Sequence, residues 1–277
     1  MPTYRDEGIV LRTHKLGEAD RIITLFTRMH GKVRAVARGV RRTSSKFGGR
    51  LEPFSHVDLQ LAEGRSLDII TQAVQLHAWA QPLSGDYELF TAGQVMVETA
   101  DKLVAVEGEP ALQQYLLLAG ALRTLAGLPA GDDTSGSRTP TMVLHSYLLR
   151  AQAIAGYAPV LDSCARCGIG LPEGDNSELV WFSPMAGGLV CRRHRPPGAA
   201  RVAAGVQGLL VALLTGDWPA VSLATPGAQR DASGMVTAYT QWHLDHGLRT
   251  MGYLERRWAE PTGLDQQSWQ SPNISNS

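Results

Sequence analysis

The sequence predicts a multidomain α+β protein: a five-stranded barrel, then a helical domain into which a metal-binding module is inserted. Three observations predict this class. Short β-rich segments fill residues 7–73, helical periodicity begins at residue 86, and all three cysteines lie in one short window with a histidine. With 277 residues, of which 44% are hydrophobic, the chain can bury a substantial core.

The first domain, residues 1–80, is predicted from five segments rich in Val, Ile, Leu and Thr. They cover residues 7–14, 21–27, 32–38, 55–62 and 66–73. Glycine-containing turn sequences separate them at Gly17, Gly31 and Gly64. Five short strands in one small domain fit a barrel of the OB type.

Positive charge is concentrated in the first 50 residues. They hold twelve Lys and Arg against four Asp and Glu, a net charge of +8, whereas the whole chain is neutral. The other 227 residues therefore carry −8. A basic first domain on an acidic body predicts a polyanionic partner.

The third predicted strand and the loop after it hold most of these cations. Val33, Ala35 and Ala37 alternate with cationic positions, so the strand is expected to bury small apolar groups and present cations outward. Residues 38–50 form a Gly- and Ser-rich loop whose cations could neutralise phosphates, although a solvated charged face is the alternative. Phe47 is expected to anchor the barrel core, with stacking on a base as the alternative.

Apolar residues recur at helical spacing after residue 86, and the helical domain is predicted to comprise residues 81–160 and 200–258. Further helices are expected at 141–155, 202–214 and 234–258. Residues 259–277 are polar and aperiodic, and are expected to form a disordered tail.

The cysteines define the inserted module, residues 161–199. Cys164 and Cys167 form one pair, and after 23 residues Cys191 and His194 form another. Three thiolates and one imidazole at this spacing are typical of one structural Zn²⁺ and leave no open position for catalysis. A hairpin of residues 179–182 and 188–190 is expected to position the second pair. The alternative is three buried thiols and a surface histidine.

Other sequence features bear on location and chemistry. No signal peptide is expected, and no apolar run reaches the length of a membrane span. Cysteines used as metal ligands favour a reducing compartment, the cytosol. Because the motifs of phosphate-binding loops, zinc proteases and serine hydrolases do not occur, the sequence does not indicate an enzyme.

Several segments resemble the bacterial RecO family of recombination mediators. They are Glu7-Gly-Ile-Val-Leu-Arg12, Gly17-Glu-Ala-Asp-Arg21, Lys46-Phe-Gly-Gly-Arg-Leu-Glu-Pro-Phe54 and the cysteine module, and the resemblance extends over residues 3–255. It implies an OB-fold, a helical domain and a zinc-binding insertion. By position it implies zinc ligands at Cys164, Cys167 and Cys191, and His194 stands in at the fourth position, where some relatives have cysteine. It also implies DNA contacts from Lys32, Arg34, Arg38, Arg41, Arg42, Lys46 and Arg50.

The resemblance also implies a function without catalysis. Such a mediator of DNA repair and homologous recombination binds single- and double-stranded DNA and anneals complementary strands. With RecR it helps load RecA onto DNA coated by the single-strand-binding protein. The implied location is the cytoplasm, in association with the nucleoid.

Three points stay open at this level. An RNA-binding or translation-associated OB protein with a zinc ribbon would share the same cations and ligands, and a zinc hydrolase is a third class. Arg192, Arg193 and Arg195 could contact phosphate or lie in a solvated turn. The acidic tail of the single-strand-binding protein is expected to enter a hydrophobic pocket of the helical domain, with Arg123, Arg150, Arg249, Arg256 and Arg257 as candidate contacts.

Overall fold

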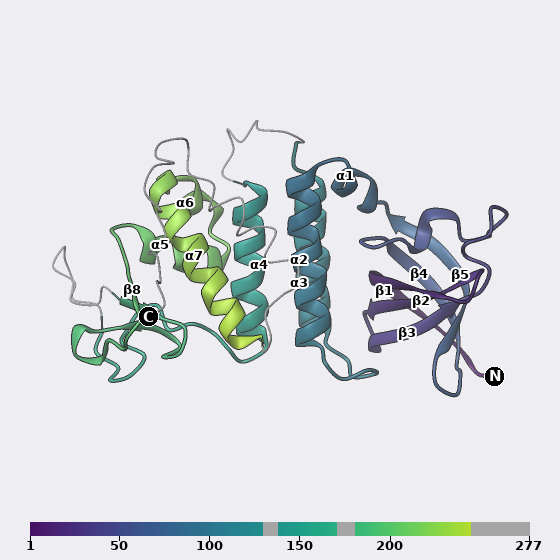
Figure 1. The fold of residues 1–277 in the computed structure, drawn as a ribbon, viewed down its shortest axis with the longest axis horizontal. Coiled ribbons are helices and arrows are strands. Elements are labelled where there is room, and N and C mark those ends of the chain that lie inside the picture. Colours follow the sequence, from purple (N-terminus) through teal and green to yellow (C-terminus); the bar gives the residue numbers. More distant parts are fainter. Residues whose placement is uncertain (130–137, 171–180, 245–277) are drawn as a thin grey trace, which may run out of the picture.

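The computed structural model describes residues 1–129, 138–170 and 181–244. The predicted tail, residues 259–277, lies outside them. Figure 1 shows the barrel, the helices and the metal-binding module in succession along the long axis of the molecule. In the described part of the chain, no helix combines the length and apolar character that a membrane span requires.

The N-terminal strands close into a barrel, as the sequence predicts. They are β1 (Thr3–Leu16), β2 (Asp20–Thr27), β3 (Gly31–Ala37), β4 (His56–Ala62) and β5 (Asp68–His77). The strand order is β1-β2-β3-β5-β4, with β3 and β5 parallel and the other pairs antiparallel. This is a small closed OB-like barrel whose inward-facing side chains fill its interior.

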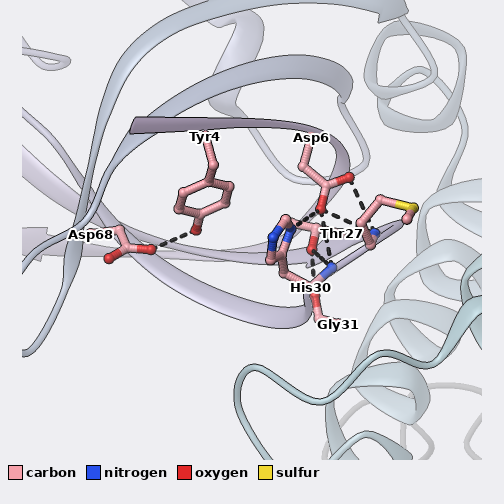
Figure 2. Close-up of polar contacts among 7 residues, drawn as sticks. Tyr4, Asp6, Thr27, His30, Gly31 and Asp68 are labelled. Carbon is pink, nitrogen blue, oxygen red and sulfur yellow. Dashed lines mark hydrogen bonds and ion pairs between the residues drawn. The ribbon is translucent and has the colours of Figure 1, made fainter. Parts of the chain in front are cut away.

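Two side chains of β1, Tyr4 and Asp6, bind to neighbouring parts of the barrel (Figure 2). The buried carboxylate of Asp6 accepts hydrogen bonds from the backbone N–H groups of Met29 and His30, each at 3.1 Å, and lies 2.6 Å from His30 Nδ1. The hydroxyl of Tyr4 donates to Asp68 at 2.5 Å. Burial and this hydrogen bond raise the pKa of Tyr4 above its usual value. The β2–β3 turn and the start of β5 are thus held by side chains from one strand.

The helices follow the barrel, and most have a recognisable N-cap. They are α1 (Ala80–Ser84), α2 (Tyr87–Leu103), α3 (Leu112–Ala126), α4 (Pro140–Ile154), α5 (Val206–Thr215), α6 (Trp218–Ser222) and α7 (Pro226–His243). The helix expected at 234–258 begins earlier, because Thr225 accepts from the Ala228 N–H and Pro226 presets the first turn. Its expected end lies outside the described residues. The helix expected at 202–214 begins at Val206, after Gly205 in a left-handed conformation.

The core of the helical domain is built around α4, of which ten of fifteen residues are buried. This helix packs against α2, α3, α5 and α7. The metal-binding module follows α4 and contains β6 (Trp181–Ser183), β7 (Gly188–Val190), η2 (Arg192–His194) and β8 (Ala200–Arg201). Its Phe182 and Leu189 join the main hydrophobic cluster. The module therefore shares the helical core, and only a small cluster of its own surrounds Cys164.

Close backbone contact joins the barrel to the helical domain. A Cβ atom on Gly31 would lie 1.8 Å from the Glu109 carbonyl oxygen, and the residue has φ +63°, so only glycine fits there. Beside it, the Gly108 N–H donates to the Lys32 carbonyl at 2.9 Å. Phe26 meets Tyr115 of α3 edge to face, with ring centroids 5.7 Å apart. These contacts set one face of the barrel against α2 and α3.

Candidate nucleic-acid interface and metal centre

Strand β3 shows the predicted alternation of buried apolar and cationic side chains, but its cations contact acidic residues of the helical domain. Val33, Ala35 and Ala37 are buried in the barrel core. Lys32 is buried too: its ammonium donates to the Asp101 carbonyl at 2.9 Å and lies 3.3 Å from the Asp101 carboxylate. The expectation that Lys32 contacts DNA is therefore corrected. The outward face of β3 at this point lies against α2, so this cation is part of the domain junction.

Arg34 occupies an intermediate position. Its guanidinium lies 3.5 Å from the Glu107 carboxylate, and 41% of its side chain is exposed. Arg12 of β1 reaches Asp101 at 3.2 Å in the same way. Acidic groups of the helical domain thus neutralise the cations that face them, and Arg34 remains a weaker candidate for DNA.

The loop after β3 keeps its cations in solvent. Arg38 and Arg42 are exposed, and neither forms an ion pair with any residue that the structure describes. Asp20 accepts from the Gly39 N–H at 2.7 Å and so holds the start of the loop beside β2. These two arginines are the clearest candidates for phosphate contact.

Arg41, Lys46 and Arg50 are exposed but each also fastens the loop. Arg41 donates to the carbonyls of Gly17 and Glu18 at 3.2 and 2.8 Å. Lys46 donates to the Thr71 carbonyl of β5 at 2.7 Å, and Arg50 donates to the Lys46 carbonyl at 2.8 Å. Carbonyl partners leave the positive charge intact, so these side chains hold the loop in shape and still present cations.

Phe47 anchors this loop in the barrel. Its side chain is 1% exposed and packs with Leu51 and Val57 in the barrel core. The Lys46 ammonium lies 5.1 Å from its ring centroid. The prediction of a core anchor is confirmed, and stacking of a base on Phe47 is ruled out by its burial.

The four predicted metal ligands come together in the module. Their ligand atoms all lie within 4.8 Å of one another. Cys191 Sγ lies 3.3 Å and Cys164 Sγ 3.9 Å from His194 Nδ1, and Cys167 Sγ lies 4.0 Å from Cys191 Sγ. A tetrahedral ion with Zn–S bonds of about 2.3 Å separates its ligands by about 3.5 to 3.8 Å. The residues therefore fit one tetrahedral metal ion held by three sulfurs and one nitrogen.

The protein backbone prepares the first of these thiols for metal binding. Burial alone would raise the pKa of Cys164, but backbone N–H groups of Cys191, Arg166 and Cys167 outweigh it and lower the pKa to about 6. Gly188, with φ +145°, lets β7 approach Val160, where a Cβ atom would lie 2.2 Å from the carbonyl oxygen. This contact fixes β7 against the segment that follows α4.

The arginines around His194 lie far from the basic loop. Arg195 stacks over Trp181, with its guanidinium carbon 3.6 Å from the ring centroid. Figure 1 places the module and the barrel at opposite ends of the long axis. The structure therefore does not bring Arg192, Arg193 and Arg195 together with the cations of the barrel.

A groove of 430 Å³ between α3, α4 and α6 contains one of the arginines expected at a tail-binding pocket. Arg150 lines it together with the apolar side chains of Leu116, Leu117 and Trp218. Leu116 is 51% exposed. Arg123 is exposed on α3 but does not line this groove. Arg249, Arg256 and Arg257 lie outside the described residues.

Sequence reasoning missed the acidic partners at the domain junction, Asp101 and Glu107. The negative charge of the helical domain was a signal that such partners exist, but their pairing with β3 depends on how the two domains meet. It also missed the uncharged polar side chains that face the basic loop, Gln75 and Gln81. Isolated glutamines have no sequence pattern that marks them.

Comparison with known proteins agrees with this architecture. A family model described as Recombination protein O N terminal matches residues 1–79, and one described as Recombination protein O C terminal matches residues 84–252. The DNA repair protein RecO of a Nocardioides species is 56% identical over 253 residues, covering 91% of this chain and 99% of that protein. The RecO proteins of Cutibacterium acnes and Thermobifida fusca are 54% and 51% identical, each over 92% of this chain and their full length.

The barrel, the helical domain and the metal-binding module occur in the order that the resemblance implies, and both family models match in that order. The identity to full-length relatives is far above the level at which a shared family could be in doubt. The chain belongs to the RecO family.

Proposed function

We propose that this protein is a non-catalytic mediator of DNA repair and homologous recombination. It binds single- and double-stranded DNA and anneals complementary strands. With RecR it helps load RecA onto single-stranded DNA coated by the single-strand-binding protein, in the cytoplasm and at the nucleoid. The names of its relatives, DNA repair protein RecO, support the first part of this proposal.

The observation that carries the proposal is the exposed cationic loop on a barrel of the RecO family. Arg38 and Arg42 are exposed, and Arg41, Lys46 and Arg50 present charge while they hold the loop in place. Contacts from such side chains go to phosphates and therefore carry no sequence preference. An annealing protein needs this property, because it must let two strands exchange registers until they match.

The direct test is annealing of complementary strands that are coated with the single-strand-binding protein, with and without RecR. We expect the protein to accelerate annealing, and RecR to be needed for RecA loading onto the coated strand. An Arg38→Ala/Arg42→Ala variant should lose most of the acceleration. Annealing by this variant at the wild-type rate would refute the loop as the DNA site.

We further propose that the metal is Zn²⁺ and that it stabilises the fold of the module. Four protein ligands fill its coordination shell, so the ion supplies folding free energy and no catalytic position. Cys164→Ser should reduce bound zinc and the melting temperature together. His194→Cys is the matched control, because it keeps four ligands and should keep both. If a well-folded, zinc-free variant lost annealing, zinc would have a role in activity.

The groove that contains Arg150 is the proposed dock for the acidic tail of the single-strand-binding protein. An apolar floor with a cation at its edge suits a peptide that ends in a hydrophobic residue and carboxylates. Arg150→Glu should weaken binding of a tail peptide, measured by fluorescence anisotropy. Arg230→Glu, at an exposed position of α7, makes the same charge change outside the groove and should leave the affinity unchanged.

RNA binding is the alternative that shares the same cations. Competition between single-stranded DNA and RNA of equal length and sequence separates the two functions. Stronger displacement by RNA, together with no annealing of coated DNA, would favour the RNA-binding alternative. A zinc hydrolase is disfavoured, because the geometry of four protein ligands leaves no place for an activated water.

A further inference from the structure

A groove of 820 Å³ runs between the basic loop and the junction of β5 with α1. One wall is formed by the loop, with Lys46 and Arg50. The opposite wall is formed by Gln75 of β5 and by Gln81 and Ser84 of α1. The groove is therefore cationic on one side and polar but uncharged on the other.

The side chains of the uncharged wall are free to bind a ligand. Gln75 and Gln81 are exposed, and within the described part of the chain neither side-chain amide forms a hydrogen bond. The buried glutamines of the same protein differ: Gln114 donates to the Ala151 carbonyl and Gln152 to Thr240. Two amides with unused donors and acceptors thus face Lys46 and Arg50 across the groove.

The other features of the groove favour an anionic chain as the ligand. Glu52, its one acidic lining residue, is paired with Arg21 at 2.7 Å, so it does not oppose an anion. A Cβ atom built on Gly48 or Gly49 would meet no atom within 4 Å, which leaves the backbone of the loop open to close approach. A phosphate backbone could therefore lie along this wall.

We propose that this groove holds unpaired bases of a single DNA strand while the strand's phosphates follow the basic loop. Each amide both donates and accepts, so it can hydrogen-bond to the exposed edge of an unpaired base. In a duplex the Watson–Crick edges are already paired and are not available to these amides. The groove thus distinguishes single strands from duplexes, which the cations alone do not. This inference rests on the proposed DNA binding by the loop.

The test compares two glutamines of the same strand. Gln75→Glu introduces a negative charge into the groove, whereas Gln72→Glu introduces it on the outer face of β5, beside Thr3 and Asp58. We expect Gln75→Glu to weaken binding of a single-stranded oligonucleotide about tenfold and of a duplex about threefold, and Gln72→Glu to change either by less than about twofold. Melting temperatures of both variants check that these exposed positions do not affect folding.

A strand of abasic nucleotides gives a second readout. The wild type should bind the abasic strand more weakly than oligo-dT of equal length, and a Gln75→Ala/Gln81→Ala variant should lose that difference. Equal effects of Gln75→Glu and Gln72→Glu, or an unchanged preference for oligo-dT in the double variant, would overturn the proposal. If instead Arg38→Ala/Arg42→Ala left DNA affinity unchanged, the proposed function of the loop would fail first.

Discussion

Strand β3 and the loop that follows it are adjacent in sequence and both rich in cations, yet the fold uses them differently. The cations of β3, Lys32 and Arg34, face the helical domain and pair with Asp101 and Glu107. The cations of the loop face solvent, and those with partners bind carbonyl oxygens. A cation remains available to a polyanion only where the fold brings no carboxylate to it.

The loop also shows how one short segment can be fixed to the barrel and still expose its cations to solvent. Phe47 is buried in the barrel, while its neighbours Lys46 and Gly48 are exposed. The loop is therefore anchored at one apolar point, and side-chain hydrogen bonds to four backbone carbonyls hold its charges at the surface. Variants of Phe47, of Lys32 and of the exposed arginines test this division, and a pH prediction tests the buried histidines, in order from the largest expected change in stability to the smallest.

Removal of the anchor should have the largest effect. Phe47→Ala deletes a fully buried ring and should lower the free energy of unfolding by about 3 to 5 kcal/mol, measured by denaturant titration. Phe47→Leu keeps most of the volume and should cost less than about 1.5 kcal/mol. If Phe47→Leu weakened DNA binding as strongly as the arginine variants do, Phe47 would belong to the DNA site after all.

Loss of the buried cation at the junction comes next. Lys32→Met keeps the aliphatic stem but removes a charged donor from Asp101, which should cost about 2 kcal/mol of unfolding free energy. The more exposed pair provides the control: Arg34→Ala should cost less than about 1 kcal/mol. Neither variant should change the salt dependence of DNA binding by as much as loop variants do. A large change of slope for Lys32→Met would mean that the junction opens to DNA.

Acid should weaken the core of the helical domain at His145 and the contact between barrel and helices at His56, and it should leave the arginine charges unchanged. Burial lowers the pKa of His145 to about 3, and burial with the neighbouring His77 lowers the pKa of His56. The pKa values of both histidines in the folded protein lie below the unfolded value of about 6.5. The folded state therefore has its full stability above pH 6.5 and loses stability as the pH falls, because the unfolded state then binds protons that the folded state does not. His145 should contribute a loss of about 2 kcal/mol between pH 7 and pH 5. A His145→Gln variant with the wild-type pH profile would contradict this assignment.

The smallest change in stability, and the clearest change in binding, is expected for the free arginines. Arg38→Ala/Arg42→Ala should alter the unfolding free energy by less than about 0.5 kcal/mol. It should flatten the slope of log K against log salt for single-stranded DNA by about 1.4. Adding Lys46→Ala should flatten it further but also loosen the loop from Thr71. The control Arg123→Ala/Arg230→Ala removes two exposed charges from the helical domain and should leave the slope unchanged.

Sequence patterns predicted the barrel well, because strand alternation and turn glycines are local. They predicted the four metal ligands for a similar reason: each pair is close in sequence, and only one ion can satisfy both pairs. They placed the start of α7 too late, because the apolar stripe begins after the Thr225 cap that starts the helix. Periodicity marks the buried face of a helix, whereas the cap decides where the helix begins.

The sequence by itself determined which residues carry charge, which can hold a metal and which family the chain resembles. Only the tertiary structure decided which cations are free, because that depends on carboxylates about 70 residues away, such as Asp101 beside Lys32. It also decided that Gln75 and Gln81 face the basic loop, since β5 and α1 meet the loop only after the barrel closes. Spacing along the chain is enough to identify ligand pairs that are close in sequence, but whether a cation is neutralised depends on all the residues that the fold packs around it.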